Sequence, residues 1–443
     1  MTWPDLSLYK ARTAATDPIG TYGRVVDVVG LTIEATGPAM SIGDLCYVEP
    51  RNVKNRKADR IPVEVVGFRG DHILLMPLGS MYGIGPGSLL FPTFAPEMVR
   101  VGSDLLGRVI DTMGQPLDSG PVPRGEMWAP LVAAPPRPLE RRRILEPIAT
   151  GIRAIDACTT CGKGQRVGIM SGSGVGKSKL LGMIARNTNA DVSVVALIGE
   201  RGREVRDFIE VDLGEDGLAR AVVVVATSDE PSLRRIKGAY MATAIAEWFR
   251  DQGADVMLLM DSLTRFAMAQ REVGLSVGEP PTTRGYPPSM YALLPKLLER
   301  AGTSPRGSIT GMYTVLVEAD DLNDPVGDAS RSILDGHIAL SRDLASRGHY
   351  PAVDVLQSVS RSMIDVTDER HQSLAQRLRQ TLAVYRDAED LINIGAYVQG
   401  SNPEIDTAIR LMPGVRSFLK QGLFEKTAFE DIPALMNKAV ASG

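Results

Sequence analysis

The sequence predicts an α/β protein: a small N-terminal β-barrel or sandwich, then a core built on a parallel sheet, then a helical C-terminal domain. Three observations predict this order. Residues 20–95 hold short strand-like runs separated by turns, and from about residue 150 apolar runs alternate with helix-length stretches. After about residue 362 the strand-like runs disappear and apolar residues recur at helical spacing. Short strands with frequent turns indicate a closed or stacked sheet, whereas strands alternating with helices indicate a parallel sheet covered on both faces.

The N-terminal strands are short and are punctuated by glycine and proline. The runs are 22-YGRVVDVVG-30, 45-LCYVEP-50, 61-IPVEVVGF-68 and 72-HILLMPLG-79. The segment 119–143 is rich in proline and lacks periodicity, so we expect an extended surface connection there. We divide the chain into a docking segment 1–20, a β-barrel domain 21–95, a core domain 96–362 and a helical domain 363–443.

The core strands are near-continuous apolar runs, and helix-length stretches such as 231–250 lie between them. The runs are 166-RVGIM-170, 192-VSVVALIG-199, 221-AVVVVA-226, 255-DVMLLM-260 and 309-ITGMYTVLV-317. In the C-terminal part, Leu374, Leu378, Leu382 and Tyr385 recur at intervals of four, four and three residues, which predicts an amphipathic helix. The same spacing continues in 404-EIDTAIRLM-412.

Composition excludes several classes of protein. The chain has 443 residues, 44% hydrophobic and 23% charged, with a formal net charge of −4. These values are ordinary for a soluble globular protein and offer no basic field for nucleic acid. The N-terminal residues hold no secretory signal, and the longest apolar runs are too short to span a membrane. Three cysteines fit a reducing cytoplasm, and we expect Cys158 and Cys161 to be small buried residues rather than half of a zinc site.

The stretch 171-SGSGVGKS-178 resembles a phosphate-binding loop. It follows the strand 166–170 directly and precedes a helical run, which is the context that such a loop requires. Its glycines would let backbone N–H groups turn inward, where they and the helix N-terminus bind phosphate. Ser171 stands where the pattern has glycine, and a small residue is compatible with that position. We therefore favour a nucleotide site over a plain Gly/Ser turn.

The nucleotide-binding residues predicted by this loop are Ser171, Gly172, Ser173, Gly174, Val175, Gly176, Lys177 and Ser178. Lys177 would reach the β- and γ-phosphates of ATP, and the Ser178 hydroxyl would bind Mg²⁺. A second metal-binding group is expected at Asp261, which ends the buried run in 255-DVMLLMDSLTRFA-267 at the sheet edge where open α/β folds bind ligands. An N-cap for the helix 262–271 is the alternative role for Asp261; the loop beside it favours the metal.

The string 196-ALIGERGREVRDF-208 places an acid at the same sheet edge. Glu200 follows the strand 192–199, and its carboxylate could polarise a water molecule in line with the γ-phosphate. A surface ion pair with Arg201 or Arg203 explains the same residues, and taken alone these residues favour that alternative.

Several strings together resemble one superfamily. The string 351-PAVDVLQSVS-360, with 171-SGSGVGKS-178, 199-GERGREV-205 and 320-DDLNDP-325, resembles the signature of the rotary ATP synthase alpha/beta subunits. The strings 151-GIRAIDACTTCGKGQRVGI-169, 347-RGHYPAVDVL-356 and 391-LINIGAYVQGS-401 are most similar to type III secretion ATPases, and 74-LLMPLGSMYGIGPG-87 resembles their flagellar branch. The resemblance covers nearly the whole chain. It implies a RecA-like P-loop ATPase core with an N-terminal small β-barrel and a C-terminal helical domain.

The resemblance also implies catalytic roles. Glu200 matches the catalytic glutamate of the family, which favours that role over the ion pair, and Arg201 matches the adjacent arginine that orders the site. Arg361 matches an arginine finger, a residue that a neighbouring subunit supplies to stabilise charge on the γ-phosphoryl group. Lys177 completes the predicted catalytic set. A finger in trans makes the single chain an incomplete site, and the family analogy implies a homohexamer.

Base recognition is implied at two aromatic residues. Tyr350 matches the family's aromatic that stacks on adenine. Phe429, or in its place Phe424, is expected to close the other side of the base. Family members usually carry Ala or Gly where Ser171 stands, which bears on nucleotide affinity rather than on the reaction.

The resemblance implies ATP with Mg²⁺ as cofactor and protein export at the flagellar base as the work done. The implied partners are a FliH-like stator regulator, a FliJ-like coiled-coil stalk, a FlhA-like membrane export gate, and export chaperones and substrates. The location implied is the cytoplasm, peripherally at the inner-membrane export apparatus. The segment 1–20 is a candidate docking site for the regulator, with a frayed tail as the alternative. The helical hairpin around 385–405 would face the central pore.

Three rival functions use the same residues. One is the ATPase of a virulence-type injectisome. Another is a hexameric RNA translocase of the termination-factor type, which needs stacking aromatics interleaved with basic residues in its N-terminal domain. Residues 20–95 have the aromatics and a local basic loop, but not an interleaved basic cluster, so we expect no nucleic-acid partner. The loop contains Arg51, Lys54, Arg56, Lys57 and Arg60. The last is a non-catalytic nucleotide-binding subunit, which the presence of Glu200 argues against.

Overall fold

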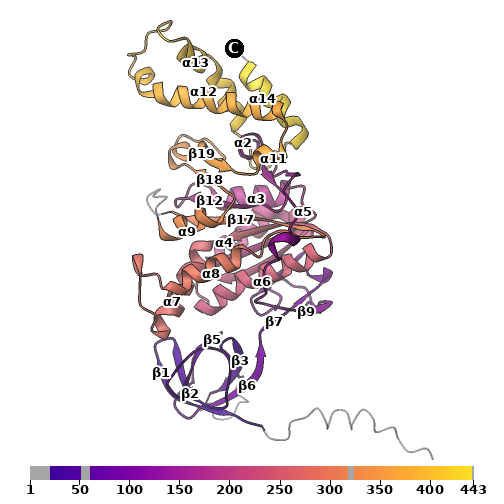
Figure 1. The fold of residues 1–443 in the computed structure, drawn as a ribbon, viewed down its shortest axis with the longest axis vertical. Coiled ribbons are helices and arrows are strands. Elements are labelled where there is room, and N and C mark those ends of the chain that lie inside the picture. The colour runs from indigo at the N-terminus through magenta and orange to yellow at the C-terminus, as the bar shows by residue number, and fades with distance from the viewer. Residues whose placement is uncertain (1–19, 51–59, 318–323, 442–443) are drawn as a thin grey trace, which may run out of the picture. The chain divides into compact units, whose positions relative to one another are not determined.

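The computed structural model describes residues 20–50, 60–317 and 324–441. The described residues before Met98, together with Ser276–Gly278, form one compact unit, and the rest of the described chain forms a second (Figure 1). Residues 1–19 of the predicted docking segment lie outside the described ranges, as do most of 320-DDLNDP-325 and the basic residues between 51 and 59.

The first unit is a closed barrel of antiparallel strands in the order β1-β2-β5-β4-β3-β6. The strands are β1 (Gly23–Val29), β2 (Thr32–Thr36), β3 (Asp44–Glu49), β4 (Ile61–Arg69), β5 (His72–Pro77) and β6 (Leu89–Pro96). Side chains such as Ile33, Val48 and Val63 are buried in its interior and alternate with more exposed neighbours. Of the two expected alternatives, barrel and sandwich, the structure shows the barrel.

The second unit is built on a sheet in the order β19-β18-β12-β17-β15-β13-β14-β8. These strands are β8 (Arg108–Asp111), β12 (Arg166–Ser171), β13 (Val192–Glu200), β14 (Ala221–Thr227), β15 (Asp255–Asp261), β17 (Ser308–Leu316), β18 (Gly336–Leu340) and β19 (Val353–Ser360). Neighbours are parallel except β19, which is antiparallel to β18, and the short β16 (Gly302–Thr303), which is antiparallel to β17. The central strands are buried along nearly their whole length, which is why their sequences are continuous apolar runs.

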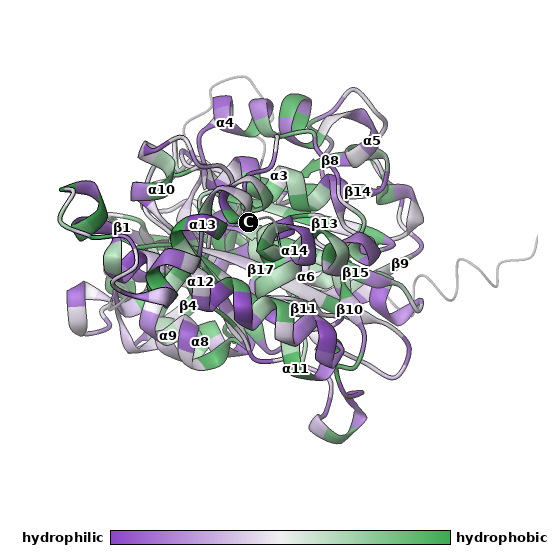
Figure 2. Ribbon diagram, turned by 90° about the horizontal axis from the view of Figure 1, so that it is seen from above, coloured by the Kyte–Doolittle hydropathy of each residue, from purple (hydrophilic) through white to green (hydrophobic). Residues whose placement is uncertain are grey.

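Helices cover this sheet. They are α2 (Arg153–Cys158), α3 (Lys177–Asn187), α4 (Gly202–Asp207), α5 (Gly214–Ala219), α6 (Ser232–Asp251), α7 (Leu263–Val277), α8 (Pro288–Leu298), α9 (Pro325–Ile333), α10 (Arg342–Ser346) and α11 (Met363–Val366). Helix α6 packs on β13, β14 and β15 and is buried on almost every side. Figure 2 shows hydrophobic residues gathered around β13, β17 and α6, and hydrophilic residues on α4 and α13.

The last helices of the described chain are α12 (Glu369–Asn393), α13 (Pro403–Leu419) and α14 (Ile432–Ala441). They lie together beyond β19 and pack on one another and on α2 (Figure 1). Asp368 caps α12 by accepting from the His371 N–H, and Asn402 caps α13 just before a proline at its first position. Leu378 of α12 is fully buried, as the helical spacing of the apolar residues predicts.

Some strands of the structure were not predicted from the sequence. The segment 119–143, expected to be an extended connection, contains β9 (Met127–Pro130), which pairs with β7 (Met98–Val101). The strands β8, β18 and β19 also join the sheet at or near its edges. Edge strands such as β19 contain polar and exposed positions, so they lack the continuous apolar signal of the central strands.

Candidate active site

The predicted phosphate loop connects the carboxyl end of β12 to the first residue of α3. Gly174 and Gly176 have φ values of 80° and 93°, which side chains with a Cβ rarely adopt, so glycine is required for this curvature. A Cβ on Gly176 would also lie 3.5 Å from the Tyr350 ring. The loop backbone therefore lies next to the N-terminus of α3, and this arrangement is suited to binding a phosphate group.

The other loop positions differ in exposure. Gly172 and Val175 are buried, Ser173 is exposed, and Ser178 is half-buried in the first turn of α3. Ser171 is fully buried: its carbonyl accepts from the Val317 N–H at 3.0 Å, and its hydroxyl has no hydrogen-bond partner among the described residues. The serine is thus accommodated inside the sheet rather than in the curved part of the loop.

Three ionisable side chains meet above the loop. The Lys177 ammonium is ion-paired to Asp261 Oδ1 and lies 3.6 Å from Glu200 Oε1. Lys177 begins α3, Glu200 ends β13 and Asp261 ends β15. Parallel strands place their carboxyl ends at one edge, so three distant parts of the sequence converge there. On β17, the Thr314 hydroxyl donates to Asp261 Oδ1 at 2.7 Å.

Burial changes the acidity of Glu200. Its side chain is 12% exposed, and burial raises its pKa from the ordinary 4.5 to about 7. The negative charge of Asp261 contributes to this raised value, and the positive charge of Lys177 opposes both causes. A carboxyl group that titrates near neutral pH can exchange protons with water, as a general base must.

A bulge turns Glu200 toward this cluster. The pairing of β13 with β14 shifts register between Ile198 and Glu200, and Gly199 has a φ of 72°. A Cβ at Gly199 would collide with the Arg265 side chain, which packs against the bulge. The Arg265 Nε is buried with no hydrogen-bond partner among the described residues. Sequence reasoning missed Arg265 and Thr314, because nothing in their local sequence marks them as neighbours of the loop.

The Asp261 carboxylate and the Ser178 hydroxyl are groups of the kind that bind magnesium. Within residues 20–50, 60–317 and 324–441, no group of three or more His, Cys, Asp or Glu side chains could hold a metal ion. Mg²⁺ in nucleotide sites uses one or two protein groups and takes its other ligands from phosphate and water. Asp261 with Ser178 has that donor chemistry, although Asp261 is bonded to Lys177 here.

Arg201 lies apart from the cluster. Its side chain is 82% exposed and lies 3.6 Å from Glu204, three residues further along α4. The surface ion pair considered for Glu200 thus involves Glu204 instead, while Glu200 points inward to Lys177.

An apolar cavity lies beside the loop. Its volume is about 330 Å³, and it is lined by Val175, Gly176, Lys179, Leu180, Met183, Leu340, Tyr350, Pro351, Ala352, Gln421 and Leu423. The half-exposed Tyr350 ring forms one wall, next to the phosphate loop. An apolar cavity next to a phosphate-binding loop is a candidate site for the flat base of a nucleotide.

The structure does not bring Phe429 to Tyr350. Phe429 instead stacks on His371, with 6.0 Å between ring centroids, because the short turn Phe429–Asp431 packs beside α12. Phe424 is 71% exposed, with the Arg186 guanidinium 5.0 Å from its ring centroid. Gln421 and Leu423 are the residues of the C-terminal part that line the cavity. Phe429 therefore does not line this cavity within the described chain, and its expected role at the base stays a prediction.

Arg361 lies at the other end of the parallel strands, away from the phosphate loop. Because β19 runs antiparallel to β18, it ends where its parallel neighbours begin. The Arg361 N–H donates to the Asp335 carbonyl at 3.0 Å, and the Asp335 N–H donates to the carbonyl of Arg166, the first residue of β12. Five residue steps along β12 separate Arg166 from Ser171, about 16 Å at the usual strand rise. The exposed Arg361 side chain is therefore too far away to reach the phosphate loop of its own chain.

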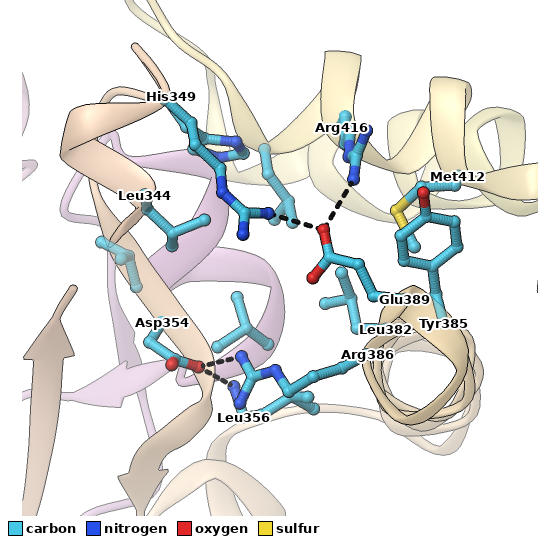
Figure 3. Close-up of a pocket in the computed structure, with 14 residues that line it drawn as sticks. Leu344, His349, Asp354, Leu356, Leu382, Tyr385, Arg386, Glu389, Met412 and Arg416 are labelled. Atoms are coloured by element: carbon cyan, nitrogen blue, oxygen red, sulfur yellow. Dashed lines mark hydrogen bonds and ion pairs between the residues drawn. The ribbon is translucent and has the colours of Figure 1, made fainter. Parts of the chain in front are cut away.

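A second cavity separates the helical domain from the segment 344–356, which carries Tyr350 (Figure 3). Charged side chains cross it in pairs. The pairs are Arg386–Asp354 at 2.9 Å, Arg347–Glu389 at 2.6 Å and Arg416–Glu389 at 3.9 Å. Asp354 also accepts from the N–H groups of Leu356 and Gln357, inside a bulge of β19. Arg386–Asp354 connects α12 to β19, Arg347–Glu389 connects α12 to the residue that follows α10, and Arg416–Glu389 joins α13 to α12.

The described helices include none that is both long and apolar enough to cross a membrane.

Comparisons with known proteins agree with this geometry. Residues 151–360 match the ATP synthase alpha/beta family, nucleotide-binding domain, and residues 367–438 match the T3SS EscN ATPase C-terminal domain. The flagellum-specific ATP synthase of Bacillus subtilis (strain 168) is 53% identical over 96% of this chain and 95% of its own length. The type 3 secretion system ATPase of Xanthomonas euvesicatoria is 48% identical, over 98% of this chain and 97% of its own.

A solved structure extends the similarity to the whole fold. The assembled ATPase EscN from the enteropathogenic E. coli type III secretion system superposes with a TM-score of 0.89 at 45% identity, covering 94% of this chain and 100% of that one. The chain therefore belongs to the ATP synthase alpha/beta family, as an ATPase of the branch formed by the flagellum-specific and type III secretion enzymes.

Proposed function

We propose that this chain hydrolyses Mg-ATP at the interfaces of a homohexameric ring and thereby energises protein export by a flagellar type III secretion apparatus. One observation carries the catalytic part of the proposal. Lys177, Glu200 and Asp261 meet at the phosphate-loop edge of the sheet, whereas Arg361 lies at the other edge, too far to serve its own chain. One subunit thus carries the phosphate-loop part of one active site and the arginine of another.

In the proposed reaction, the backbone N–H groups of residues 171–178 and the Lys177 ammonium bind the phosphates. The Glu200 carboxylate orients a water molecule and takes its proton, for which a pKa near 7 is suited. Asp261 and Ser178 would hold Mg²⁺, which neutralises phosphate charge when bound. Arg265, a partly buried cation whose side chain packs against Gly199, would add positive charge beside this bulge.

Arg361 would complete the site of an adjacent copy. An arginine finger adds about 10³–10⁵ in rate in other phosphoryl-transfer systems. Every copy carries both Glu200 and Arg361, so identical subunits in a closed ring leave no site unfilled. Arg201, exposed at the start of α4, would be ordered by nucleotide or by the neighbouring copy.

The flagellar assignment rests on the relatives. The relative from Bacillus subtilis is named a flagellum-specific ATP synthase at 53% identity, and relatives named type 3 secretion system ATPase reach 48%. An injectisome ATPase is therefore the second candidate. EscN has been solved with its central stalk EscO, which supports a coiled-coil stalk partner for this chain. The stator regulator, the membrane export gate, the chaperones and the location at the inner membrane belong to the same proposal.

Two experiments test the function. ATP turnover of the purified chain should require Mg²⁺ and should fall by at least about 10²-fold in Glu200→Gln and Lys177→Ala. Turnover that survives both changes would refute the proposed site. To separate the two export systems, the gene is placed in a bacterium lacking its own flagellum-specific ATPase and in one lacking its injectisome ATPase. Restored swimming without restored effector secretion supports the flagellar assignment, and the reverse result supports the injectisome.

A further inference from the structure

Gln165, the residue before β12, is fully buried and uses both ends of its side-chain amide. Its Oε1 accepts from the Gly162 N–H at 2.9 Å. Its Nε2 donates to the Asp335 carbonyl at 3.1 Å and to the Ser360 hydroxyl at 3.0 Å. Ser360 in turn donates to the Thr160 carbonyl at 2.7 Å. A buried amide with this many partners fixes the groups around it, because losing it would leave several of them unsatisfied.

The groups that Gln165 holds are those that place Arg361. Ser360 is the residue immediately before Arg361, and the Asp335 carbonyl also accepts from the Arg361 N–H at 3.0 Å. The Asp335 carboxylate is held by Arg166, whose Nε donates to it at 3.0 Å and whose backbone N–H donates at 3.1 Å. The Ser360 side chain is thus tied to Gln165, and the Arg361 backbone is tied through Asp335 to Arg166, the first residue of β12.

We propose that Gln165 is a positioning residue for Arg361, which sets where this arginine stands in the catalytic site of the neighbouring copy. The inference rests on the proposed role of Arg361 in trans. It gives β12 two duties: its carboxyl end carries the chain's own phosphate loop, and its amino end holds the arginine that the chain supplies to its neighbour.

The physical reason for such a device is the precision that a charge-stabilising group needs. A displacement of about 1 Å in a catalytic constellation can cost about 10²-fold in rate. Arg361 follows an edge strand, and its side chain is exposed in the single chain, so its position depends on what holds its backbone. The Gln165 amide supplies that hold from the buried side.

The test compares Gln165→Leu, which keeps the approximate size of the side chain and removes its hydrogen bonds, with wild type. We expect kcat to fall by about 10- to 100-fold, while the affinity of the dilute chain for a fluorescent ATP analogue stays within about twofold. Ser360→Ala is the milder second variant, because it removes one partner of Gln165 and keeps a small residue. The control is Gln270→Leu: Gln270 is also buried, and it donates only to Ser289, on α8. Thermal unfolding identifies variants that fail to fold.

Mixing variants separates the inference from the function on which it rests. Glu200→Gln subunits keep an intact Arg361 and Gln165, so they should rescue Gln165→Leu and Arg361→Ala subunits in mixed rings. At equal amounts, about a quarter of the sites would be complete, because each needs one subunit of each kind in the right order.

Three outcomes oppose the proposal in different ways. Suppose that Glu200→Gln subunits rescue Arg361→Ala but do not rescue folded Gln165→Leu. Gln165 would then act on the site of its own chain, which would overturn the inference and leave the proposed function standing. Normal kcat in both Gln165→Leu and Ser360→Ala would overturn it as well. Failure to rescue Arg361→Ala would withdraw the role in trans, and the inference with it. Rescue of both, with a normal kcat for Gln270→Leu, supports the proposal.

Discussion

Lys177 has two structural tasks at once. It is the cation of the phosphate loop itself, and it neutralises Asp261 and Glu200, two acids that would otherwise repel each other in a buried place. When a nucleotide binds, its phosphates and a metal ion would compete for the ammonium and for the Asp261 carboxylate. The ion pair is thus a resting arrangement that occupies the site with complementary charges.

Lys177→Ala should therefore harm both chemistry and the resting state. We expect kcat/KM to fall by about 10³-fold or more, equivalent to roughly 4 kcal/mol of lost transition-state stabilisation. Without the Lys177 ammonium, which lowers the pKa of Glu200, this carboxyl group would hold its proton to higher pH, so the variant should lose thermal stability as pH rises from 6 to 8. Steady-state kinetics and thermal unfolding measure the two effects. Arg206→Ala is the control, because Arg206 is 77% exposed and pairs with Glu210 at 2.8 Å, outside the cluster. Equal losses in both variants would contradict the role given to Lys177.

Glu200 predicts a pH dependence of known sign. A base must be deprotonated to accept a proton, and burial raises the pKa of Glu200 to about 7. We expect kcat/KM to rise tenfold per pH unit below that value and to level off above it, because kcat/KM reports ionisations of the free enzyme. Residual turnover of Glu200→Gln should show no such limb. A profile that stays flat from pH 5.5 to 8 in the wild type would count against Glu200 as the base.

Among the secondary-structure elements, β19 connects the most parts of the site. Its first residues follow Tyr350, its bulge is held by Asp354, and its last residue precedes Arg361. Asp354 also pairs with Arg386 of α12, so the helical domain is tied to the same strand (Figure 3). A movement of α12 would thus bear on the strand between the base cavity and the arginine.

Asp354→Asn should loosen this joint. It weakens the pair with Arg386 and the acceptor for two backbone N–H groups, at a cost of roughly 1 kcal/mol, since Arg386 is 47% exposed. We expect KM for ATP to rise a few-fold because the segment that carries Tyr350 is less well fixed. Thermal unfolding and KM are the measurements. Arg203→Gln, which breaks an exposed pair with Asp207 on α4, should change neither. An unchanged KM in Asp354→Asn would show that the joint does not reach Tyr350.

The elements also show how far a sequence can predict a site. The phosphate loop, the strands that end at Glu200 and Asp261, and the barrel–core–helix order were predictable, because they depend on local spacing and periodicity. Arg265 and the Gln165–Ser360 contact were not, because sheet order brings them together across long stretches of chain. Phe429 was placed by similarity to a weakly aligned segment, and the packing of α12 and α14 decides its position instead. The boundaries of the predicted domains stay predictions.

For the whole molecule, the phosphate loop and Arg361 lie at opposite ends of the same strand, and this separation limits what a single chain can catalyse. The phosphate loop follows the carboxyl end of β12, and Arg361 is bonded to Asp335 beside its amino end. No rearrangement that keeps the sheet intact can bring Arg361 to the loop of the same chain. The chain alone should therefore bind ATP and hydrolyse it poorly.

Specific activity should consequently rise with protein concentration and level off when assembly is complete. Below the assembly range, wild type and Arg361→Ala should have the same low turnover, because neither receives the arginine of a neighbour. Above it, wild type should exceed Arg361→Ala by about 10³-fold or more. Turnover measured from nanomolar to micromolar chain, alongside the mass of the assembly by light scattering, tests both statements. Arg361→Ala should assemble as wild type does, since its backbone contact with Asp335 remains. A specific activity that is constant across the range in which the mass rises would mean that each chain carries a complete site, and the separation of the two edges would then have no catalytic meaning.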